Sequence, residues 1–229
     1  MPSWGTHLVI ASRINIIKKM SKDEFSFSNI MPDILEGYLI KNLSKHVRYS
    51  TTHFSKTMNI NGIDIVMPDI AKFKKLYDKE MENPIICGYY CHLITDYFWN
   101  YYTYKNHFKC IDKEENLIEV TLVNKNKKLL TWNEAVRLKQ KDFTNFSLYL
   151  KENNYIYYPN YDKKIYESSS KIREIKLTEE DIKKTIEYIK DNIKNKKIEK
   201  IYKYKMLSKE ELKKMFEACY EFVMEKLES

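Results

Sequence analysis

The chain has 229 residues, of which 43% are hydrophobic and 14% aromatic, so it can bury a sizeable core and disorder is excluded as its main state. Its net charge is +8, but lysine supplies nearly all of the 40 basic residues. Because phosphate and base recognition favours the planar fork of arginine, no stable nucleic-acid complex is expected. The few glycines stand apart, which excludes a glycine-rich loop of the P-loop or dinucleotide-binding type.

Helical periodicity dominates the N-terminal half of the chain. It predicts helices over residues 6–20, 32–43, 68–77 and 84–104. Thr6 is the expected cap of the first helix, and a proline opens each of the other three. Residues 57–67 form either an irregular loop or a small hairpin around Asn61-Gly62.

The C-terminal half begins with a weak alternation over residues 117–123, which indicates a short strand or more loop. Thr131 is expected to cap a helix that runs to about residue 150, and a connecting loop is expected over residues 155–170. Thr178 and Ser208 each precede acidic residues and an apolar periodic face, the start signal of a capped helix. Two charged amphipathic helices, joined by a lysine-rich stretch, should therefore end the chain.

These elements predict an all-α fold, a helical bundle in which residues 1–170 form one domain and residues 171–229 form charged helices packed on it or appended to it. The start of the chain lacks the pattern of a signal peptide, and the cysteines form no C-x-x-C pair or disulfide framework. The helix over 84–104 is long enough to span a bilayer, but His92 and Asp96 would be costly at its centre. We expect a cytoplasmic protein with reduced thiols and no transmembrane segment.

The strongest local pattern is His92 and Asp96, one turn apart on one face of an otherwise uncharged helix. Such a pair is commonly only hydrogen bonded. In a buried helix, however, an unpaired carboxylate is costly unless a cation or several donors compensate it. Gly88 lies a turn earlier, where a missing side chain would let another backbone or an ion approach closely.

Three further residues complete a set of candidate metal ligands. His7 and Asp33 lie at predicted helix starts, and His53 lies in a Thr-Thr-His-Phe run. Each alone has an ordinary structural explanation as a surface, core or helix-terminal residue. Together with His92 and Asp96 they supply imidazole and carboxylate groups, ligands that suit zinc and neighbouring divalent ions.

Four blocks of sequence, in this order, resemble the zinc-dependent phospholipase C family, whose superfamily includes zinc-dependent single-strand nucleases. The blocks are MPSWGTH at residues 1–7, FSNIMPD at 27–33, THF at 52–54 and GYYCHLITDY at 88–97. The resemblance spans residues 1 to about 104. It implies an all-helical fold around a cluster of up to three metal ions that cleaves phosphodiesters.

The resemblance also implies roles for individual residues. The positions that match the four ligands of one zinc are Asp33, His53, His92 and Asp96. His7, with a shared Asp96, matches part of a second site. His46 competes with His53, because its separation from Asp33 is nearer to that of the secreted enzymes, but the Thr-His-Phe context favours His53. Asp33 would lie closest to the nucleophilic water, as a base or a water-orienting group.

The chain also departs from the family pattern. Secreted members use a processed N-terminal tryptophan as a ligand, whereas Trp4 is internal in this sequence. For the remaining zinc, His107 fits one role, no histidine follows it, and Asp142 is the best acidic substitute. We therefore expect one or two ions, of zinc or another divalent transition metal, and not three.

The main functional hypothesis is a metal-dependent phosphoesterase, in which a metal-activated water attacks a phosphodiester or phosphomonoester. The substrate would be a lipid head group, a nucleotide or a small molecule. The alternative is a non-catalytic helical protein, stabilised by its metal, that binds a partner or an anionic surface. Helical phosphohydrolases with adjacent His-Asp ligands are excluded, because no histidine directly precedes an aspartate.

Overall fold

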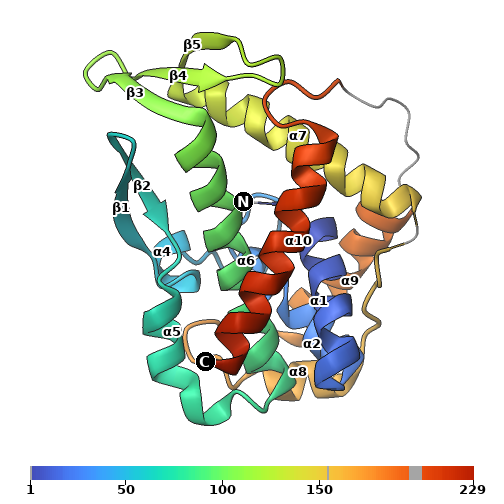
Figure 1. The fold of residues 1–229 in the computed structure, drawn as a ribbon. Coiled ribbons are helices and arrows are strands. Elements are labelled where there is room, and N and C mark those ends of the chain that lie inside the picture. Colours follow the sequence, from blue (N-terminus) through green and yellow to red (C-terminus); the bar gives the residue numbers. More distant parts are fainter. Residues whose placement is uncertain (1, 154, 196–202) are drawn as a thin grey trace.

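A long helix, α6 (Pro84–His107), runs through the middle of the computed structural model, which describes residues 2–153, 155–195 and 203–229 (Figure 1). The helices α2 (Lys22–Ser28), α5 (Ile70–Tyr77) and α10 (Lys209–Glu228) pack against it. A second pair, α1 (Trp4–Lys18) and α7 (Trp132–Glu152), packs together beside them. The shorter helical elements are α3 (Met31–Ile34), α4 (Tyr49–Thr52), η1 (Asp78–Glu80), α8 (Lys163–Ser169), α9 (Glu179–Ile189) and η2 (Lys190–Lys194).

Two antiparallel sheets show that the all-α prediction is wrong and that the chain is mixed α/β. One is the hairpin of β1 (Lys56–Ile60) and β2 (Ile63–Met67), and the other has the order β3 (Phe108–Asp112), β4 (Leu117–Thr121), β5 (Lys127–Thr131). The strands have five residues each, and burial alternates clearly along β2. So few residues give little periodicity to find in a sequence dominated by helical signals.

The sequence indicated a hairpin or an irregular loop at residues 57–67 and a strand or more loop at residues 117–123. The structure has the hairpin and the strand. Asn61 and Gly62 adopt positive φ angles of 51° and 82°, as a two-residue turn between twisted strands requires. β3 and β5, which flank the expected strand, were not predicted. β3 follows α6 directly, so this sheet lies at the C-terminal end of the central helix (Figure 1).

The central helix confirms its prediction. Asn83 caps it by accepting hydrogen bonds from the backbone N–H groups of Ile85 and Ile86, and Pro84 occupies the first turn. It is buried over most of its length because other elements surround it. No helix in the described part of the chain is long and apolar enough to span a membrane.

The three later caps are also confirmed. Thr131 and Thr178 each form a capping box, with Glu134 and Asp181, and Ser208 caps α10. Part of the lysine-rich stretch between α9 and α10, residues 196–202, lies outside the described residues. The division into 1–170 and 171–229 stays a prediction, although α10 packs along α6.

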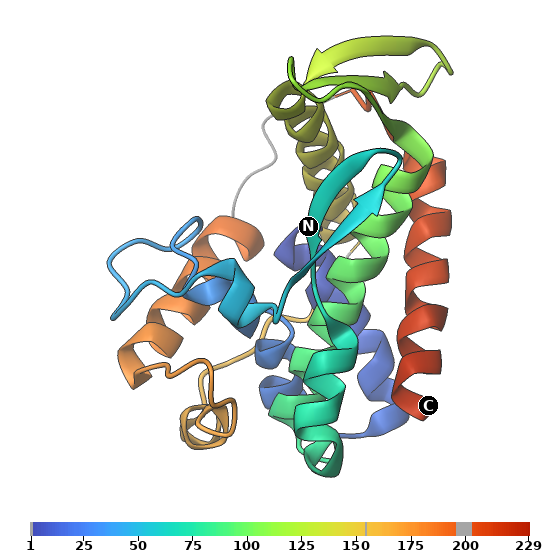
Figure 2. The ribbon, with the colours of Figure 1, turned by 90° about the vertical axis from the view of Figure 1, so that its left-hand side faces the viewer.

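Three predictions for local structure are wrong. The helix expected over 32–43 ends at Ile34, and Gly37 and Asn42 beyond it adopt left-handed conformations, with φ of 75° and 59°, that a continuous helix excludes. Residues 35–47 instead form a loop, closed by a hydrogen bond of 2.8 Å from the Val47 N–H to the Leu35 carbonyl. Figure 2 shows this loop projecting at the edge of the molecule beside α9. Elsewhere, α8 forms where a connecting loop was expected, and Ser3 rather than Thr6 precedes the first helix.

Candidate metal centre

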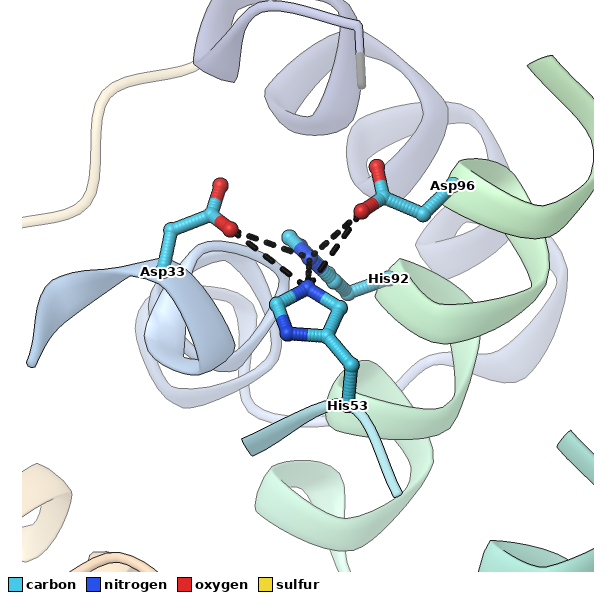
Figure 3. Close-up of side chains that lie close together, drawn as sticks. All are labelled: Asp33, His53, His92 and Asp96. Carbon is cyan, nitrogen blue, oxygen red and sulfur yellow. Dashed lines mark hydrogen bonds and ion pairs between the residues drawn. The ribbon is translucent and has the colours of Figure 1, made fainter. Parts of the chain in front are cut away.

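Three separate elements bring together the four residues that the resemblance assigned to one zinc. Asp33 lies on α3, His53 caps the C-terminus of α4, and His92 and Asp96 lie one turn apart on α6 (Figure 3). Asp33 is 6% exposed and the other three are fully buried. In Figure 3 the two carboxylates lie on either side of the two imidazole rings and point toward them.

Five distances between the ligand atoms of these side chains are close to those around a tetrahedral ion. The His53 Nε2 atom lies 3.5 Å from Asp33 Oδ1, 3.3 Å from Asp96 Oδ2 and 3.2 Å from His92 Nε2. His92 Nε2 lies 3.6 Å from the same oxygen of each carboxylate. Ligands about 2.0–2.1 Å from a tetrahedral zinc are about 3.3 Å apart. This buried cluster of Asp33, His53, His92 and Asp96 could therefore hold a metal ion.

The hydrogen bonds behind the two rings determine which nitrogen faces the cluster with a lone pair. His92 Nδ1 lies 2.7 Å from the Asn29 carbonyl, which can only accept, so Nδ1 carries the proton. His53 Nδ1 lies 3.1 Å from the Glu36 carboxylate and 2.8 Å from the Thr52 hydroxyl, which itself donates to Glu36. Two neutral rings held in this way direct two lone pairs at each other, and a cation between them removes the repulsion.

The carboxylates also lack donors. The indole N–H of Trp4 donates to Asp33 Oδ2 at 2.9 Å. Within the described residues, Asp33 Oδ1 and both oxygens of Asp96 receive no hydrogen bond of normal geometry, although they are buried. Because burying a bare carboxylate oxygen is costly, these atoms also indicate a place for a cation.

The pKa shifts of the histidines and aspartates of the cluster also indicate that positive charge is favoured there. Burial by itself would raise the pKa of Asp33 and Asp96, but the charge of His92 and the close contacts with histidine nitrogens lower the pKa of both, that of Asp96 well below its ordinary value. Burial would lower the pKa of His53 and His92, yet the facing carboxylates raise both. The pKa of His7 is lowered, by burial and by the charge of His92. Where no metal is bound, protons on His53 and His92 would supply the charge.

His7 lies beside the cluster and not in it. Its ring stacks on that of His92 with centroids 4.1 Å apart, and its Nε2 lies 3.2 Å from Asp96 Oδ1. Asp96 thus has one oxygen toward the four-residue cluster and the other toward His7. Only these two side chains meet at this second position, and the described residues contain no second group of three or more potential ligands.

The structure does not bring the other candidates to the cluster. His107 lies eleven residues beyond Asp96 on α6, a rise of roughly 16 Å, and its nitrogens contact the Thr121 carbonyl and Glu211. His46 is exposed next to Gly37. Asp142 accepts the backbone N–H groups of residues 205, 206 and 207 and so holds the segment before α10.

Sequence reasoning missed the groups that hold the ligands. Glu36 and Thr52 support His53, Tyr49 stacks on the same ring at 4.0 Å, and the Asn29 carbonyl supports His92. Thr52 was inside a block that resembles the family. Glu36 lies three residues after Asp33. Its role as a support of His53 could have been suspected only if the loop that follows α3 had been known.

A cavity of about 380 Å³ borders the cluster. Asp33 and Glu36 lie in its wall, next to Trp4, and the opposite walls come from α7 and from the α9–η2 segment, with Lys151 and Tyr188 among them. Asp33 is the member of the cluster that meets the cavity, since the cavity wall includes no other of the four. A molecule in the cavity would therefore approach the cluster from the Asp33 side.

Comparison of the chain with family models, with curated proteins and with solved structures finds no match. The resemblance to the zinc-dependent phospholipase C family stays a prediction. What the chain does is inferred below from the cluster and the cavity.

Proposed function

We propose that the chain is a metal-dependent phosphoesterase that holds zinc, or another divalent transition metal, on Asp33, His53, His92 and Asp96. The observation that carries the proposal is a buried set of four ligand atoms, all within 4.8 Å of one another, in contact with a cavity. The order and spacing of the four sequence blocks support phosphoester chemistry. A cytoplasmic location, which is expected from the sequence, is part of the same proposal.

Some residues of the site would hold the ion, and others would bind the substrate. Zinc held there would lower the pKa of a water that binds it in addition to the four side chains, and it would polarise a phosphoryl oxygen. Asp33 is held by the Trp4 indole on one oxygen and meets the cavity, so it orients the attacking water and accepts its proton. Lys151 adds positive charge to the cavity wall, where a phosphate would lie.

The test is hydrolysis of bis(4-nitrophenyl) phosphate and 4-nitrophenyl phosphate by the purified chain. We expect turnover that a chelator abolishes and zinc restores. Asp33→Asn should lower kcat by about a hundredfold or more, whereas His46→Ala, at an exposed position outside the cluster, should not. Turnover that survives the chelator, or an Asp33→Asn variant as fast as the wild type, would contradict the proposal.

A second candidate function is a non-catalytic metal site. It is favoured by the full burial of His53, His92 and Asp96 and by the number of protein ligands, since four is typical of structural zinc. This alternative predicts bound zinc with no turnover of either phosphoester. The same assay, run on samples of known zinc content, decides between the two.

A further inference from the structure

The loop of residues 35–47, the pocket loop, presents two apolar side chains to solvent beside the cavity. Tyr38 is 81% exposed and Leu39 is 44% exposed, and both line the cavity. The next residue, Ile40, is buried and anchors the loop in the core. Figure 2 shows that the loop lies at the outer edge of the molecule, where a flat surface could reach it.

Hydrogen bonds hold the pocket loop in the conformation that exposes Tyr38 and Leu39. The backbone N–H and hydroxyl of Ser44 donate to Asp181 at 2.8 and 2.5 Å, and Lys184 Nζ donates to the Asn42 carbonyl at 3.1 Å. A further hydrogen bond, between residues 47 and 35, closes the base of the loop. Closed loops of this kind hold their side chains in place, so Tyr38 and Leu39 form a preformed tip.

The exposed charged side chains next to the tip in sequence are basic. The sequence has no aspartate or glutamate from residue 37 to residue 63. Lys41, Lys45 and Arg48 are exposed, and none of them forms an ion pair with a described residue. On the neighbouring α9, by contrast, the lysines pair with glutamates of the same helix. Lys41, Lys45 and Arg48 therefore offer positive charge to a partner, while the Asp181 carboxylate of α9 is occupied by Ser44 and Thr178.

We propose that the pocket loop docks on an anionic phospholipid surface, with Tyr38 and Leu39 among the head groups and Lys41, Lys45 and Arg48 facing the lipid phosphates. Tyrosine suits such an interface because one end of its side chain is apolar and the other is polar. Each basic side chain near an anionic leaflet adds to the attraction. Because Tyr38 and Leu39 line the cavity, docking in this way places the cavity beside the membrane, and it does not depend on hydrolysis.

Co-sedimentation with vesicles tests this docking directly. The full chain is mixed with phosphatidylcholine vesicles, with or without about a third of phosphatidylserine. We expect binding to the anionic vesicles to be about tenfold or more stronger than to the neutral ones, and to weaken as salt is added. Soluble phosphoserine should not compete, because a single head group offers neither a surface nor an apolar layer.

Three variants locate the contact. Tyr38→Ser/Leu39→Ser and Lys41→Glu/Lys45→Glu should each lower binding about tenfold or more. Ile16→Ser/Ile17→Ser is the matched control, because these side chains are 73% and 54% exposed at the end of α1, and it should bind as the wild type does. All of the substituted side chains are exposed, so circular dichroism and thermal unfolding should stay unchanged.

Equal binding to neutral and anionic vesicles, no binding to either, or full competition by phosphoserine would overturn the proposal. So would a tip variant that binds normally, or a control variant that loses as much. Because the readout is vesicle binding, a chain that hydrolyses no phosphoester still tests the docking. Equally, failure to bind vesicles leaves the test of the phosphoesterase proposal intact.

Discussion

At the residue scale, each imidazole of the cluster is held from behind by a group that can only accept a hydrogen bond. The Asn29 carbonyl holds His92, and the Glu36 carboxylate holds His53. Both rings therefore present Nε2 with a lone pair to the same point, 3.2 Å from each other. Such supports keep the ligand atoms in position and make the rings more basic, which favours metal binding.

Replacing a ligand should empty the site. His92→Ala removes one of four ligand atoms and leaves the two carboxylates of the cluster facing a single imidazole. We expect the purified variant to hold less than about a tenth of the zinc of the wild type, as measured by elemental analysis. His46→Ala, at an exposed histidine, is the control and should keep its zinc.

Replacing a support should weaken the site without emptying it. Glu36→Gln keeps the shape of the side chain but removes the charge that faces His53 Nδ1. Zinc affinity, measured by competition with a chromophoric chelator, should fall about 10–100-fold. Glu180→Gln is a suitable control, because Glu180 is exposed on α9. An unchanged affinity in Glu36→Gln would show that this carboxylate does not support the ligand.

The four residues of the cluster could be predicted to lie together because their residue types and their order in the sequence carry the signal. The Asn29 support could not, since it is a backbone carbonyl that any residue would offer. His107 shows the opposite failure: it has the right residue type, but it lies at the far end of the helix that carries Asp96 and contacts Glu211 instead. Residue type alone does not place a side chain in space.

At the element scale, the close approach of α2 to α6 positions one of these supports. A Cβ atom on Gly88 would lie 2.6 Å from the Phe25 carbonyl and 1.8 Å from the Ser28 hydroxyl oxygen. The missing side chain of Gly88 lets the end of α2 lie against α6. The sequence predicted that another backbone or an ion would approach at this position. Asn29 caps α2, so this contact also brings its carbonyl to His92.

Gly88→Ala should therefore destabilise the fold. Both helices would have to shift, with a cost of about 1–3 kcal/mol in the free energy of unfolding, measured by urea denaturation. Adding Ser28→Ala should recover only part of the loss, because the Phe25 carbonyl still lies too close. A Gly88→Ala variant as stable as the wild type would contradict this account of the contact.

A second contact between elements should depend on pH. His107 at the end of α6 lies 2.7 Å from Glu211 on α10. Burial would lower the pKa of His107, but Glu211 raises it above 6.5, and His107 in turn lowers the pKa of Glu211 below 4.5 although burial would raise it. The pair contributes most between pH 4.5 and 6.5, and its contribution is lost above the raised pKa of His107 and below the lowered pKa of Glu211.

The comparison of wild type with His107→Gln measures this contribution. The difference in unfolding free energy should be largest near pH 5.5 and should shrink as the pH rises through the pKa of His107. The difference in unfolding free energy between the wild type and Glu211→Gln should depend on pH in the same way. A difference that stays constant from pH 5 to pH 9 would indicate that the pair is held by packing and not by charge.

Helix starts could be predicted well at this scale, because caps such as Thr131 and Thr178 are local signals. The short strands could not, since β3 and β5 are stabilised by pairing with β4, which no single segment encodes. The predicted helix over 32–43 failed at Gly37, where the chain turns to form the pocket loop.

At the scale of the whole molecule, the cluster joins parts of the chain that are far apart in sequence. Its four residues come from α3, α4 and α6, while the cavity beside it is completed by α1, α7 and the α9–η2 segment. The cavity could not be predicted, because it exists only once the C-terminal helices pack. Three buried carboxylates, Asp33, Glu36 and Asp96, gather at this centre, and a divalent ion would offset most of their charge. Metal binding and folding should therefore be coupled.

The measurement that tests the centre most directly is zinc K-edge X-ray absorption on the purified chain, with the metal content determined on the same sample. We predict at least one zinc per chain, bound to two imidazole nitrogens and to carboxylate oxygens at about 2.0–2.1 Å. A folded chain that holds no divalent transition metal and takes up none on titration would contradict the account, as would a metal spectrum without imidazole.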